Sequence, residues 1–197
     1  MNENIPVSSD RVTDLLHLAQ RPVWIVTASN GARRGGLVAT FVLQSSIDPE
    51  RPVLVIGLAP NHFTTGLVRD SGRVGLHLVT RQQIDHVWRF AVGSGRDRDK
   101  LEGLELLPSE LGVPLLADCL AWFECRVIHE YESGDRIFFW TDVVRGGKQS
   151  AGSPLLEREV FELATPDHMR ALNADLLADI ALQRPLVDAW RHTHVKR

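Results

Sequence analysis

The feature that most constrains the fold of this 197-residue chain is a series of short apolar segments separated by turn-forming residues. These segments are rich in β-branched and aromatic residues, as at residues 23–27 and 53–58, which is typical of β-strands. The strands do not alternate regularly with long helices, and this order argues against a doubly wound parallel sheet. It predicts a mainly β fold, a closed or split antiparallel barrel of about six strands with helices at both ends.

The individual elements are predicted from local patterns. Strands are expected at residues 23–27, 37–47, 53–58, 74–79, 119–131 and 136–145. Helical spacing of apolar residues predicts helices over residues 9–20, from about Thr64 to Gly72, over 84–91 after a capping box at Thr80-Arg81-Gln82-Gln83, and over about 166–191. Pro185 is expected to kink or divide the last of these helices, because proline lacks the backbone N–H donor.

Length and composition bound the class of protein. A chain of this length usually closes around one core, so residues 1–197 are expected to form a single domain with its barrel at about 20–150. The net charge of −3 gives no electrostatic footprint for nucleic acid. Two Cys cannot form a disulfide framework, and no apolar run approaches the roughly 18 residues of a membrane span. The polar, acidic start lacks the features of a secretory signal, which predicts a cytoplasmic location.

The common catalytic and metal-binding motifs do not occur in this sequence. There is no G-x-x-x-x-G-K-[ST] loop, no G-x-G-x-x-G between a strand and a helix, and no H-E-x-x-H. Cys119 and Cys125 share one face of an expected strand, where buried thiols are a simpler interpretation than metal ligands. We therefore predict no metal site and assign no catalytic residue.

Two groups of hydroxyl side chains have alternative interpretations. Ser45 and Ser46 end an apolar strand, where they either bond to the local backbone or form a cradle for an anion. Thr64 and Thr65 stand at an expected helix start, three residues after Asn61, and either cap the helix or bind a phosphate at its N-terminus. Neither group identifies a function by itself.

Five stretches occur in an order that resembles the flavin reductase-like family of FMN-binding split-barrel proteins, over about residues 20–150. They are residues 36–49 (GLVATFVLQSSIDP), 61–64 (NHFT), 94–100 (SGRDRDK), 119–125 (CLAWFEC) and 134–138 (GDRIF). The resemblance implies a homodimer that holds FMN, or FAD, at its interface and accepts hydride from NADH or NADPH. It also implies site residues, position by position: Val38, Ala39 and Thr40 along the isoalloxazine, Gln44, Ser45 and Ser46 at the ribityl chain or phosphate, and Asn61 and Thr64 at the phosphate.

Arg136 stands where the family often has a histidine on the nicotinamide side. An arginine cannot act as a proton donor near neutral pH, but it can pair with a dinucleotide phosphate. The loop residues Arg33, Arg34, Arg96 and Arg98 are either solvated surface charges or further ligands of such a phosphate.

The sequence thus predicts an NAD(P)H:flavin oxidoreductase, as the reductase component of a two-component monooxygenase, whose helical tail covers a partner subunit. The alternative is a non-enzymatic FMN-carrying electron-transfer protein. A cofactor-free or heme-binding barrel of the same shape is a third interpretation.

Overall fold

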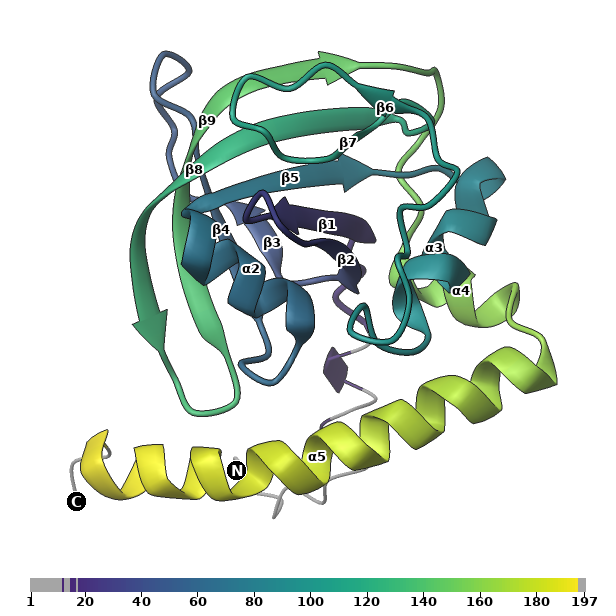
Figure 1. The fold of residues 1–197 in the computed structure, drawn as a ribbon. Helices are drawn as coiled ribbons and strands as arrows, with labels where there is room; N and C mark the ends of the chain where they lie inside the picture. The colour runs from purple at the N-terminus through teal and green to yellow at the C-terminus, as the bar shows by residue number, and fades with distance from the viewer. Residues whose placement is uncertain (1–11, 13–14, 17, 195–197) are drawn as a thin grey trace, which may run out of the picture.

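A computed structural model describes residue 12, residues 15–16 and residues 18–194. Its main feature is a seven-stranded sheet in the order β2-β1-β5-β8-β9-β4-β3, in which every neighbouring pair is antiparallel. The sheet curls into a barrel (Figure 1). The strands are β1 (Trp24–Ser29), β2 (Arg34–Ala39), β3 (Val42–Gln44), β4 (Val53–Leu58), β5 (Arg73–Leu78), β8 (Ala121–Glu132) and β9 (Ile137–Lys148), and a separate two-stranded sheet contains β6 (Leu106–Leu107) and β7 (Leu115–Leu116). The predicted fold class is confirmed.

The strand count differs from the prediction because residues 37–47 form two strands. β2 pairs with β1, whereas β3 pairs with β4 at the opposite edge of the sheet. Between them the chain turns through Thr40 and Phe41, so the two edge strands are consecutive in sequence without pairing with each other. One straight strand cannot pair with neighbours at both edges, and the single strand expected over 37–47 was therefore wrong.

The barrel interior is apolar and includes one of the two cysteines. Its buried residues include Val26, Ile56, Leu76, Cys125 and Phe139. Cys119 and Cys125 are both free, and burial raises the pKa of each thiol to about 12. The buried-thiol interpretation is confirmed, because such a pKa keeps the sulfur protonated and unreactive at neutral pH.

His77 on β5 is a fully buried polar side chain with two partners. Its Nδ1 lies 3.0 Å from the Ile25 carbonyl oxygen, and its Nε2 accepts the backbone N–H of Leu116 at 3.0 Å. This pattern requires the neutral ring, since Nε2 must keep its lone pair. Burial is the largest cause that lowers the pKa of His77, to about 4.

The helices pack around the barrel. They are α2 (Phe63–Ser71), α3 (Ile84–Ala91) after the 3-10 turn η1 (Arg81–Gln83), α4 (Glu157–Glu162) and α5 (Pro166–His194). The capping box is confirmed: Thr80 Oγ1 accepts the Gln82 N–H, and Gln83 Oε1 accepts the Thr80 N–H. The helix predicted over residues 9–20 lies mostly outside the described residues. None of the helices in the described part of the chain could cross a membrane.

The long helix α5 passes beneath the barrel, past α2 and the β8–β9 hairpin (Figure 1). Pro185 lies inside it and does not divide it. The helix continues through this position, because the missing N–H removes one hydrogen bond of the helix and leaves those on either side in place. A Cβ built on Gly134 in the hairpin would lie 2.8 Å from Val187 Cα, so the hairpin backbone packs directly against α5.

Candidate functional site

A cavity of about 540 Å³ lies between the barrel and α5. Four elements contribute to it: β2, the start of α2, the end of α3 with the loop that follows, and the middle of α5. The lining residues are Gly36, Leu37, Val38, Asn61, His62, Phe63, Thr64, Phe90, Ala91, Gly93, Ser94, Gly95, Arg96, Asp97, Lys100, Leu172, Asp175, Leu176, Ala178 and Asp179. Its size falls in the usual range for a cofactor or small-molecule site.

The start of α2 brings polar donors to this cavity. β4 ends at Leu58, and α2 begins at Phe63 after a short connection that contains Pro60, Asn61 and His62. His62 is the N-cap residue, and its side chain makes no capping hydrogen bond within the described structure. Free backbone N–H groups and the helix dipole make such an end favourable for an anion. Thr64, in the first turn and 2% exposed, also faces the cavity.

The apolar wall of the cavity depends on glycines. A Cβ on Gly36 would lie 2.5 Å from Phe90 Cε1, and a Cβ on Gly95 would lie 2.8 Å from Phe63 Cδ1. These contacts are too close for any other residue without movement of a ring. The glycines therefore let β2 and the loop after α3 approach the two aromatic rings.

Lys100 supplies a buried cation at the cavity. It is 2% exposed, and its Nζ donates a hydrogen bond to the Phe90 carbonyl oxygen at 2.7 Å. Burial, and then the nearby charge of Arg98, lowers the pKa of Lys100 to about 8. The side chain is still mostly protonated at pH 7. Lys100 was not among the predicted site residues, although it ends the SGRDRDK stretch that could have pointed to it.

A hydrogen-bond network connects the start of α2 to α5. Asn61 Nδ2 donates to Asp179 Oδ1 at 2.7 Å, and His62 Nε2 lies 2.8 Å from Asp179 Oδ2. Gln183 Nε2 donates to Asn61 Oδ1 at 3.0 Å, while Gln183 Oε1 accepts from Arg136 Nη1 at 2.8 Å. The network thus joins two predicted site residues, Asn61 and Arg136, through Gln183.

The polar residues of α5 that reach the cavity and the network were not predicted from the sequence. Asp175, Asp179 and Gln183 are spaced four residues apart, which places them on one stripe of the helix. That spacing predicts a polar face on the helix, but it does not predict which part of the protein this face contacts.

The structure places the predicted site residues in two groups. Val38, Asn61 and Thr64 line the cavity, whereas Ala39 and Thr40 do not, and Ala39 is buried in the barrel core.

The second group, Gln44, Ser45 and Ser46, lies at the end of β3 and does not line this cavity. There Ser46 bonds locally, since its Oγ accepts the Asp48 N–H at 3.1 Å and its carbonyl oxygen accepts from Gln44 Nε2 at 2.6 Å. The flavin roles given to both groups remain predictions.

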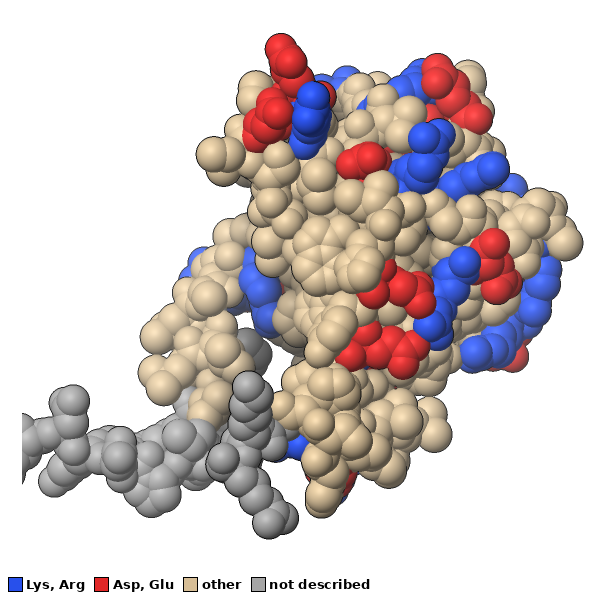
Figure 2. Space-filling view, turned by 90° about the vertical axis from the view of Figure 1, so that its left-hand side faces the viewer, with Lys and Arg blue, Asp and Glu red and all other residues tan. Residues whose placement is uncertain are grey.

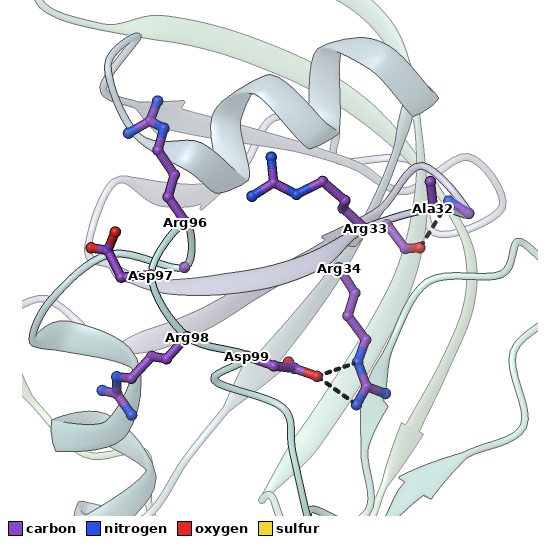
Figure 3. Close-up of a pocket in the computed structure, with 10 residues that line it drawn as sticks. Ala32, Arg33, Arg34, Arg96, Asp97, Arg98 and Asp99 are labelled. Atoms are coloured by element: carbon purple, nitrogen blue, oxygen red, sulfur yellow. Dashed lines mark hydrogen bonds and ion pairs between the residues drawn. The ribbon is translucent and has the colours of Figure 1, made fainter.

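The loop arginines line a second pocket of about 410 Å³, and their guanidinium groups point in different directions from it (Figure 3). Arg34 forms an ion pair with Asp99 at 2.8 Å, and Arg98 donates to two backbone carbonyl oxygens at the end of α3. Arg96 Nη2 donates to the Asn61 carbonyl oxygen, and the Arg33 guanidinium lies 4.2 Å from the centroid of the Phe63 ring. The guanidinium groups of Arg34, Arg96 and Arg98 therefore have hydrogen-bond partners in the described structure, and that of Arg33 lies over an aromatic ring.

The curled antiparallel sheet with its flanking helices is the fold of the split-barrel flavoproteins. Residues 16–161 match the family described as flavin reductase like domain, and the chain belongs to this family. The resemblance seen in the five sequence stretches is thereby confirmed.

Individual relatives show how far the likeness extends. A high molecular weight rubredoxin of Moorella thermoacetica is 28% identical over 145 residues, which cover 73% of this chain and 62% of that protein. An uncharacterized protein of Aeropyrum pernix is 32% identical over 119 residues, which cover 58% of this chain and 44% of that protein. The chain thus spans less than two thirds of the length of these curated relatives.

Solved structures share the fold. Nitrilotriacetate monooxygenase component B of Mycobacterium thermoresistibile has 25% identity and a TM-score of 0.65, covering 75% of this chain and 82% of that one. An NADH:FAD oxidoreductase of Streptomyces globisporus has 20% identity and a TM-score of 0.67, covering 77% of this chain and 91% of that one. At 20% identity the second likeness concerns the fold alone.

Proposed function

We propose that this protein binds FMN or FAD in the cavity beneath β2 and α2 and catalyses NAD(P)H-dependent flavin reduction. The observation that carries the proposal is that one cavity brings together the start of α2, which has no side-chain cap, the side chains of Asn61 and Thr64, the buried cation Lys100 and an apolar wall. A phosphate needs such donors, and an aromatic ring system needs such a wall. The family to which the chain belongs supports the same assignment.

The residues fit a phosphate-bearing flavin by their chemistry. The α2 backbone N–H groups, Asn61, Thr64 and Lys100 would hold the phosphate, while Leu37 and Val38 would contact the ring system. A bound flavin supplies reversible acceptance of a hydride. The chain's contribution is to exclude water and to hold the reactants close, which needs no protein acid or base. That explains why no acid–base pair stood out in the sequence.

The arginine pocket supports a dinucleotide co-substrate. It shares Gly95, Arg96 and Asp97 with the larger cavity, so one ligand can reach both. Four guanidinium groups against two carboxylates give the pocket a positive balance that suits phosphate groups. We assign this pocket to the phosphates of NADH or NADPH. Arg136 lines neither pocket, and the nicotinamide-side role that the sequence suggested for it stays a prediction.

A homodimer is the proposed assembly. Apolar side chains on the side of β3, β8 and β9 are exposed, among them Leu43, Ile128, Tyr131 and Val144. Figure 2 views the molecule from the side of β8 and β9 and shows a broad uncharged region next to clusters of charged residues. Exposed apolar area of this kind marks interaction surfaces. The name of one structural relative, a monooxygenase component, supports a separate oxygenase as the consumer of reduced flavin.

The alternative function is an FMN-carrying protein that exchanges electrons with protein partners and does not turn over NAD(P)H. The observation in its favour is the relative named as a rubredoxin, an electron-transfer protein by that name.

One experiment separates these functions. The purified protein is titrated with FMN and FAD, and its visible spectrum is recorded anaerobically before and after NADH or NADPH. Flavin binding with rapid bleaching by a nicotinamide supports the reductase. Bound flavin that nicotinamides do not reduce supports the electron carrier, and failure to bind any flavin refutes both.

A further inference from the structure

The carboxylate of Asp179 occupies Asn61, one of the donors that the proposed function gives to the flavin phosphate, together with the neighbouring His62 ring. Its two oxygens lie 2.7 Å from Asn61 Nδ2 and 2.8 Å from His62 Nε2, at the start of α2. A second α5 carboxylate, Asp175, accepts the Gly93 N–H at 3.2 Å in the same cavity. A carboxylate and a phosphate oxygen seek the same hydrogen-bond donors and the same positive helix end.

Asp179 and a bound phosphate would compete for the Asn61 side-chain amide and for the space at the start of α2. A phosphate dianion beside Asp175 and Asp179 would meet like charges at short range in a partly enclosed cavity, where screening by water is weaker. Either the phosphate stays out or this part of α5 moves away from the start of α2.

We propose that Asp179 competes with the flavin phosphate for the start of α2, so that α5 makes the flavin an exchangeable ligand. This inference rests on the proposed function, and it favours a reductase that releases reduced flavin over a tight carrier of FMN. The positively charged groups that attract the phosphate, Lys100 and Arg96, stay in place when α5 moves, because they belong to the loop after α3.

Contacts on both sides of Asp179 confine the movement to the middle of α5. Toward the N-terminal end, the rings of Trp88 and His168 stack with centroids 4.0 Å apart. Toward the C-terminal end, the backbone of Val187 packs on Gly134. Pro185 lies between Gln183 and this second contact, and its missing N–H leaves the helix weaker there.

The test compares FMN with riboflavin, which has the same ring system but no phosphate. Dissociation constants are measured by flavin fluorescence for the full-length wild type and Asp179→Ala, with Asp188→Ala as a matched control. Asp188 is an exposed carboxylate on the same helix that does not line the cavity. We expect Asp179→Ala to bind FMN roughly tenfold more tightly, since a hydrogen-bonded charged competitor is gone, while riboflavin binding and the control stay unchanged.

Other outcomes overturn the inference in distinguishable ways. Weaker FMN binding by Asp179→Ala would mean that Asp179 positions Asn61 for the phosphate, and equal tightening for riboflavin would mean that it acts only by closing the cavity. Failure of the wild type and both variants to bind either flavin would refute the proposed function itself. Hydrogen exchange gives a second readout: FMN should speed exchange of amides at residues 175–183 in the wild type, and slower exchange there would contradict the competition.

Discussion

Replacing Gly36 by alanine adds a single methyl group that tests both the packing of β2 on Phe90 and the proposed flavin cavity. A Cβ there would lie 2.5 Å from Cε1 and 2.7 Å from Cδ1 of Phe90. The Phe90 side chain is 1% exposed and packs in an apolar cluster on one side, while its other side lines the cavity, so the added methyl group must either strain the cluster or push the ring into the cavity. Overpacking of this kind costs about 1–3 kcal/mol. For a domain of this size, Gly36→Ala should lower Tm by roughly 3–10 °C and weaken FMN binding.

Gly66→Ala is the matched control, because the same methyl group there has the opposite effect. Gly66 lies inside α2, and nothing comes within 4 Å of a Cβ built on it. Alanine in an exposed helical position should stabilise the protein by about 0.5–1 kcal/mol. Urea unfolding of both variants measures the two effects. If Gly36→Ala were as stable as the wild type, the close approach of β2 to Phe90 would be wrong.

Four further predictions concern the site and the fold. FMN affinity should fall as pH rises through about 8, where Lys100 loses its proton, and Lys100→Met should flatten that profile in a fluorescence titration. The free energy of unfolding should decrease by roughly 3 kcal/mol as pH falls from about 6.5 to 4, because His77 takes up a proton in the unfolded state but stays neutral in the folded state, where its pKa is about 4. Urea titrations of His77→Gln and the wild type over this pH range measure the effect. The same dependence of the unfolding free energy on pH in both proteins would contradict it. Thr64→Ala should weaken FMN binding by about 1–3 kcal/mol, and an unchanged dissociation constant would refute the assignment of Thr64 to the phosphate. Deletion of the tail after Glu162 should weaken dimerisation, and a native dimer by light scattering would exclude that role.

The sequence by itself determined the elements whose causes are local. The bounds of β4 coincide with the apolar run at residues 53–58, since a turn precedes it and Pro60 ends it. Gly72 ends α2 because it adopts a left-handed conformation with φ of 64°, which glycine accepts without strain. The order of motifs was enough to identify the family.

Only the tertiary structure decided how distant segments meet. No local pattern shows that residues 37–47 divide between opposite edges of the sheet, because that depends on which strands they pair with. No pattern in α5 tells what its polar stripe faces, and the structure brings Asp179 to Asn61 across 118 residues of chain. Hydrogen bonds and charges act through space, so the residues that compete for one anion site need not be neighbours in sequence.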